Sequence, residues 1–105
     1  MITVKQGDTY PPLRAYLQMV TGKAIRLSGA SVKLIVLDKN GVSKINKAVT
    51  IVDEEKGYVE YKWVTADTSL PGEYKAEFEV TQQDGSIVTV PNDGYFTINI
   101  SNELG

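Results

Sequence analysis

The stretch Glu73-Tyr74-Lys75-Ala76-Glu77-Phe78-Glu79-Val80-Thr81 decides the fold class of this chain. Apolar side chains alternate in it with three glutamates and a lysine. Successive side chains of a strand point to opposite faces, so this pattern predicts a strand with one buried and one solvated face. Such strands are typical of antiparallel sheets.

The same two-residue alternation recurs along the chain, separated by turn signals such as Asn40-Gly41 and Asp84-Gly85. The predicted strands are 2–5, 12–19, 31–38, 43–52, 58–64, 73–81, 86–91 and 95–101. Short strands joined by tight turns favour two packed sheets. The sequence therefore predicts an all-β protein, an immunoglobulin-like antiparallel β-sandwich of about seven to eight strands, with residues 1–105 as a single domain.

The composition excludes several kinds of chemistry. The 105 residues include no Cys and no His, which excludes disulfides, thiolate ligands, Ser-His triads and His-based zinc sites. The formal charge is −2, and lysines and arginines are scattered singly, so no nucleic acid partner is expected. No apolar run approaches the ~20 residues that span a bilayer, so no membrane partner is expected either.

Residues 6–13, Gln-Gly-Asp-Thr-Tyr-Pro-Pro-Leu, form an unusual cluster near the N-terminus. Gly7 permits a bend and Asp8 can bond nearby backbone N–H groups, while Pro11 and Pro12 favour extended geometry. The cluster lacks a base and the spacing of a phosphate loop. We therefore interpret it as a corner between two strands, after which Leu13, Ala15 and Leu17 point inward.

A second corner is predicted at Asp67-Thr68-Ser69-Leu70-Pro71-Gly72-Glu73-Tyr74. An Asp, a turn and a Tyr that opens a strand resemble the tyrosine corner of Greek-key sandwiches, in which the phenol bonds to upstream backbone. Asp67, Pro71, Gly72 and Tyr74 are assigned to this corner.

The predicted strand 31–38 breaks the alternation. Val32, Leu34 and Val36 share one face, but Ile35 and Leu37 point the other way. Either the fold covers both faces of this strand, or the outer face meets another subunit.

Three chemical functions deserve weighing. Asp53-Glu54-Glu55 with Asp38 and Asn40 could bind calcium, although these residues also suit turns. Asp8, Asp67 and Asp84 could supply a glycosidase pair, although their spacing does not favour it. Tyr10, Tyr16, Tyr58 and Tyr95 could stack on sugars, which makes a carbohydrate-binding module contacting host cell-wall glycans the alternative function. No cofactor is expected.

The order of the motifs resembles a phage family. The segments are GDTYPPL (7–13), LSGASVKLIVLDKNG (27–41), GYVEYKW (57–63), ADTSLPGEYKAEFEVTQQDG (66–85) and PNDGYFTINI (91–100). They are similar to the N-terminal domain of the baseplate upper protein of tailed phages that infect Gram-positive bacteria.

This resemblance implies a structural virion protein of the tail or baseplate, made in the host cytoplasm, that acts as an attachment module and not as an enzyme. Its partners would be other tail or baseplate proteins, with a homo-oligomer as a further possibility. The candidate interface residues are Tyr16, Ile35, Leu37 and Tyr95. Full-length members of that family continue into a helical, oligomerising region.

Overall fold

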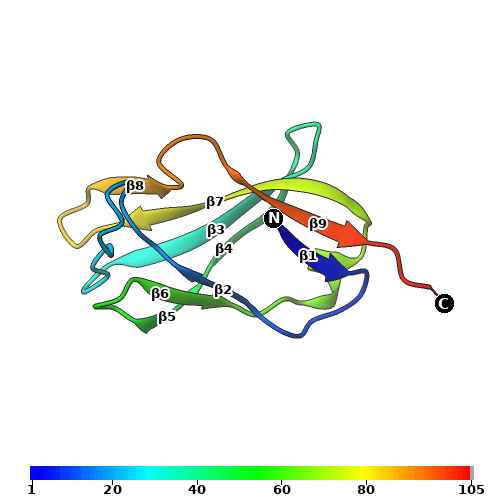
Figure 1. Ribbon diagram of the computed structural model, residues 1–105, viewed down its shortest axis with the longest axis horizontal. Helices are drawn as coiled ribbons and strands as arrows, with labels where there is room; N and C mark the ends of the chain where they lie inside the picture. The colour runs from blue at the N-terminus through cyan, green and yellow to red at the C-terminus, as the bar shows by residue number, and fades with distance from the viewer. Residues whose placement is uncertain (105) are drawn as a thin grey trace.

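The computed structural model describes residues 1–104, which form nine strands and one short 3-10 helix (Figure 1). The elements are β1 (Ile2–Lys5), β2 (Leu13–Tyr16), β3 (Ser31–Leu37), β4 (Ser43–Ala48), β5 (Thr50–Asp53), β6 (Tyr58–Tyr61), η1 (Thr65–Thr68), β7 (Gly72–Thr81), β8 (Ile87–Val90) and β9 (Phe96–Ser101).

The strands lie in two facing sheets. The large sheet has the order β1-β9-β7-β3-β4, with β8 also paired to β7, and the small sheet has the order β2-β6-β5. The orders β9-β7-β3-β4 and β2-β6-β5 match the G-F-C-C′ and B-E-D arrangements of immunoglobulin variable-type domains. The predicted all-β, immunoglobulin-like sandwich is therefore confirmed, and β7, the strand that decided the prediction, lies in the middle of the large sheet.

The predicted strand 43–52 was wrong as a single element, which is why there are nine strands. It divides at Val49, whose N–H donates to the Val32 carbonyl at 2.9 Å. β4 pairs with β3 in the large sheet and β5 pairs with β6 in the small one. Alternation of apolar and polar side chains continues through such a crossing, so the pattern alone does not reveal it.

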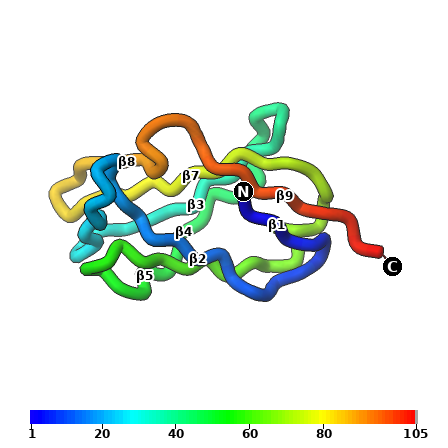
Figure 2. Tube along the Cα trace, in the orientation of Figure 1, coloured from blue at the N-terminus to red at the C-terminus, as the bar shows by residue number. Residues whose placement is uncertain are grey.

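One pairing departs from the antiparallel prediction. β1 runs parallel to β9, with Ile2 opposite Ile98 and Val4 opposite Ile100. Figure 2 shows the N-terminal segment beside β9 before the chain descends to β2. The chain leaves β1 at Lys5 and crosses to the small sheet through residues 6–12. The direction of β1 is therefore set by the need to end next to this crossing.

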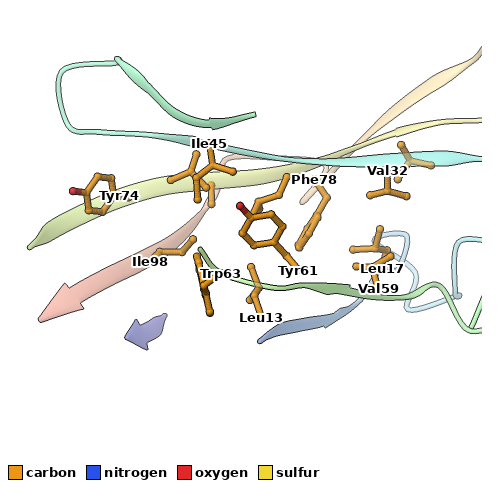
Figure 3. Packing of buried hydrophobic residues seen from close by; sticks show 14 of the residues in the cluster. Leu13, Leu17, Val32, Ile45, Val59, Tyr61, Trp63, Tyr74, Phe78 and Ile98 are labelled. Atoms are coloured by element: carbon orange, nitrogen blue, oxygen red, sulfur yellow. The ribbon is translucent and has the colours of Figure 1, made fainter. Parts of the chain in front are cut away.

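The core fills the space between the sheets (Figure 3). Leu34, Val59 and Val80 are fully buried, and the ring of Tyr61 meets Trp63 edge-on with centroids 5.6 Å apart. The inward face of β7 supplies Tyr74, Ala76, Phe78 and Val80, as the alternation predicts. The outer faces of both sheets therefore carry the side chains that are free to meet other molecules.

Candidate functional site

Residues 6–12 carry the chain from the large sheet to the small one. β1 ends at Lys5 in the large sheet and β2 begins at Leu13 in the small sheet. The Gly7 N–H donates to the Thr68 carbonyl at 3.0 Å, and Trp63 Nε1 donates to the Pro11 carbonyl at 3.1 Å. Every one of these bonds joins backbone to the body of the sandwich, so this corner has a structural role.

The Asp8 side chain does not bond backbone N–H groups as expected. Within residues 1–104 its backbone is used instead: its N–H donates to the Lys5 carbonyl, and its carbonyl accepts the Thr68 hydroxyl, both at 3.0 Å. Gly7 has φ of 82°, and Pro12, at the other end of the corner, is half-buried. The bend therefore comes from Gly7 and the anchoring from Thr68.

The second corner contains the bond that defines a tyrosine corner. Tyr74 Oη donates to the Leu70 carbonyl at 2.6 Å, across exposed Pro71 and across Gly72, which opens β7. Thr68 in η1 is fully buried and makes two bonds to the first corner, one through its carbonyl and one through its hydroxyl. Sequence reasoning assigned Thr68 no role, yet it joins the two corners, together with Gln6, whose side-chain amide donates to the Ser69 carbonyl at 3.0 Å.

Asp67, in the second corner, is the centre of a polar cluster. Its carboxylate is 4% exposed, accepts the Tyr61 hydroxyl at 2.6 Å and the Val64 N–H at 2.9 Å, and lies 3.6 Å from Lys47 Nζ. Sequence reasoning placed Asp67 in a turn but missed Tyr61 and Lys47. Lys47 comes from β4 of the large sheet, twenty residues before Asp67 in η1, so no local signal could have paired the two.

This cluster predicts an alkaline loss of stability. Burial and the hydrogen bond to Asp67 raise the pKa of Tyr61 above its ordinary value of about 10. Above pH ~10 the unfolded chain loses the phenol proton before the folded chain does, so the free energy of unfolding falls as pH rises. Below pH ~10 this group does not affect the free energy of unfolding. Urea titrations on both sides of pH ~10 should show this fall, and the Tyr61→Phe variant should show a shallower one. An equal slope in the two proteins would contradict the prediction.

Three of the four predicted interface residues meet on the outer face of the large sheet. Ile35, Leu37 and Tyr95 line a hollow of about 140 Å³, whose other walls are Lys75, Ala76, Glu77 and Gly94. Ile35 and Leu37 are half-buried, and the Lys75 ammonium lies 4.9 Å from the centre of the Tyr95 ring. The fold therefore covers Ile35 and Leu37 only in part, through residues of β7 and of the segment before β9.

Tyr16 lies on the other sheet. It projects from β2 on the outer face of the small sheet and stacks on Tyr58 of β6, with centroids 4.5 Å apart and planes at 17°. Beside this pair, Arg14 Nε donates to a Glu60 carboxylate oxygen at 3.2 Å. The predicted interface set therefore falls on two opposite surfaces. The predicted sugar-stacking tyrosines are divided too, with Tyr16 and Tyr58 on the small sheet, Tyr95 at the hollow and Tyr10 exposed in the first corner.

The remaining acidic candidates serve in turns. Asp38 Oδ1 accepts the Asn40 and Val42 N–H groups at 2.8 and 2.9 Å, and these bonds lower the pKa of Asp38. Asp53 Oδ1 accepts two N–H groups of its own turn in the same way. Within residues 1–104 no three acidic side chains are grouped as a metal site would require.

Asp84 bonds Ser86 in the turn that follows β7, whereas Asp67 precedes β7. A strand of this length separates the two acids by about 30 Å, because each residue rises about 3.3 Å. A glycosidase needs carboxyl groups about 5 to 10 Å apart, so Asp67 and Asp84 cannot form such a pair.

The part of the chain that the structure describes contains no helix long and apolar enough to cross a membrane.

Solved structures share the fold. The N-terminal domain of phage TP901-1 ORF48 has a TM-score of 0.67 at 14% identity, with 96% of this chain and 84% of that chain covered. CopC from Methylosinus trichosporium OB3b has a TM-score of 0.59 at 14% identity, with 99% and 86% covered. At this identity both show the fold alone. No curated protein matches the sequence.

The strand order and the two packed sheets define an immunoglobulin-like β-sandwich domain. Residues 2–104 match the family model of the BppU N-terminal domain. The chain therefore belongs to the BppU N-terminal domain family, the family of the phage baseplate upper protein, which confirms the resemblance predicted from the order of the motifs. It is a structural component of a phage tail or baseplate and interacts with other tail and baseplate proteins.

Proposed function

We propose that residues 1–105 act as one attachment domain that docks onto a neighbouring baseplate protein and catalyses no reaction. The observation that carries this proposal is the hollow on the large sheet, where Ile35, Leu37 and Tyr95 come together. The domain would be made in the cytoplasm of the bacterial host and would enter the virion by this contact, alone or as a homo-oligomer.

The exposed chemistry of the hollow suits docking. Tyr95 is 53% exposed, and Ile35 and Leu37 keep part of their apolar surface in water. Covering this surface is favourable, and aromatic side chains set into pockets supply much of the binding energy of interfaces.

The experiment compares the natural protein with two variants in assembling phage. We expect the chain in purified particles, and we expect Leu37→Glu to lower its incorporation about tenfold or more, because it places a charge in the contact. Val20→Glu is the matched control, since Val20 is 83% exposed in a loop and outside the hollow. Both variants should keep the thermal midpoint of the natural protein.

Absence of the chain from purified particles would overturn the attachment role. Normal incorporation of Leu37→Glu would show that docking uses another surface.

The Tyr16–Tyr58 pair supports a second candidate, a carbohydrate-binding module. Tyr16 is 59% exposed, and its ring leaves apolar surface free on the small sheet. An aromatic ring with one solvent-exposed face suits contacts with ligands that combine apolar surface and hydroxyl groups, as sugars do. Binding to purified cell-wall glycan that is lost in Tyr16→Ala and kept in Tyr95→Ala would favour this function, and absence of binding would dismiss it.

A further inference from the structure

We propose that the docking partner presents a basic, extended segment, with an apolar side chain that enters the hollow and a Lys or Arg beside it that pairs with Glu77. This inference rests on the proposed docking function and specifies the chemistry of the partner. The partner is thus a protein segment of stated charge, and a second copy of this chain or a glycan would be a different outcome.

The size of the hollow limits which side chain of the partner can enter it. Its volume is about 140 Å³, below the ~300 to 1,000 Å³ of sites for small-molecule ligands. One water occupies about 30 Å³ of liquid, so the hollow has the capacity of a single aliphatic or aromatic side chain. Ile35 and Leu37 on β3 and the Tyr95 ring give this side chain apolar walls.

The charges around the hollow indicate the charge of the partner side chain that lies beside it. Glu77 lines it, and the residue directly opposite Glu77 on β3 is Ile35, which carries no charge. The nearby Lys75 ammonium lies over the Tyr95 ring. Among residues 1–104, none of the ion pairs includes Glu77. A carboxylate at the rim of an apolar hollow is therefore available to a cation from outside.

Neighbouring charges on β7 add to this field. Glu73 and Glu79 point to the same outer face as Glu77, and they also take part in none of the ion pairs of the described residues. Lys75 points to the same face between Glu73 and Glu77, and Lys33 is opposite Glu79, so two lysines offset part of the charge of the three glutamates. The row carries more negative than positive charge, so a basic segment is attracted and an acidic one is repelled.

The spacing of an extended segment fits this arrangement. Alternate residues of a strand lie about 7 Å apart on one face. A segment with a leucine flanked at both second neighbours by lysine would present its apolar and basic side chains together to the hollow and the glutamates. Either direction of the segment would satisfy this requirement.

The test titrates the isotope-labelled domain with the peptide acetyl-Lys-Thr-Leu-Thr-Lys-amide and follows its amide NMR signals. We expect shifts at Ile35, Glu77 and Tyr95. We expect no such shifts with the peptide in which glutamates replace the lysines. Exchanging the peptide leucine for alanine should weaken binding about threefold or more, because it removes apolar surface from the hollow.

Two variants of the domain separate charge from shape. Glu77→Gln should weaken binding about two- to fivefold and reduce its dependence on salt. Tyr95→Ala should weaken it about tenfold. The matched control is Glu55→Gln, which makes the same change of charge in the exposed turn after β5 and should leave affinity unchanged.

Equal shifts with the acidic peptide, shifts on the small sheet, or no shifts would overturn the inference. Shifts at the same three residues that depend on protein concentration without peptide would assign the hollow to a second copy and would also overturn it. If Leu37→Glu fails to enter particles while the basic peptide does not bind, the docking function stands and the basic partner is rejected.

Discussion

Replacing Gly57 with alanine is expected to lower the free energy of unfolding by about 2 to 5 kcal/mol. Gly57 has φ of 65°, a conformation that costs other residues about 1 to 2 kcal/mol. A Cβ added there would lie 2.6 Å from the Leu17 carbonyl oxygen and 2.8 Å from that of Ile25. These are backbone atoms, so the clash cannot be relieved by rotating a side chain, and overpacking adds its own cost.

Urea unfolding monitored by tryptophan fluorescence measures this effect, and Gly41→Ala is the matched control. Gly41 has φ of 81°, and a Cβ built there meets nothing within 4 Å. The control should therefore lose only the conformational part, about 1 to 2 kcal/mol. Equal losses at both positions would show that the close approach to residues 17 and 25 does not contribute.

Replacing Asp67 with alanine is expected to cost about 2 to 4 kcal/mol. The change leaves the hydroxyl of Tyr61 without its acceptor in a place where Tyr61 is only 5% exposed. An unsatisfied buried donor costs about 1 to 3 kcal/mol, and the bond to the Val64 N–H is lost as well. The contact with Lys47 adds little, because that side chain is 52% exposed.

A double-mutant cycle tests the reason for this loss. Tyr61→Phe removes the hydroxyl that Asp67→Ala leaves unpaired, so the double variant should lose less stability than the sum of the single variants, by about 1 kcal/mol or more. Strict additivity would mean that Asp67 acts on the Val64 turn and not through Tyr61. The same pair of variants links stability to pH, since Tyr61 is the group whose pKa the cluster raises.

These stability effects are separable from docking. Gly57 is buried against residues 17 and 25, and Asp67 is buried beside Tyr61, whereas the hollow lies on the outer face of the large sheet. Variants of the hollow change side chains that are already partly in water. Loss of incorporation or of peptide binding at unchanged stability is therefore the signature of the contact itself.

Much of the fold was predictable because each strand obeys a local rule. The alternation in 73–81 fixes which face of β7 is buried, and the turn at Asp84-Gly85 lies between two strands as predicted. Ile35 and Leu37 depart from the alternation, and this departure correctly indicated two of the residues that line the hollow. The tyrosine corner was visible because its donor and acceptor are four residues apart in the sequence.

The candidate site was only partly predictable because it joins distant segments. Tyr16 and Tyr95 look alike in the sequence, but one lies on the small sheet and the other at the hollow. Lys47 of β4 meets Asp67 of η1, and Thr68 meets Asp8 across sixty residues of chain. No local pattern contains such pairs.

The sequence by itself determined the all-β class, the buried face of each main strand and the two corners, because side-chain alternation and turn chemistry act between near neighbours. Only the tertiary structure decided that 43–52 crosses between sheets, that β1 runs parallel to β9, and that Tyr95 joins Ile35 and Leu37 beside Glu77. Those outcomes depend on which strands become neighbours, which is settled by packing one core between two sheets and not by any single segment.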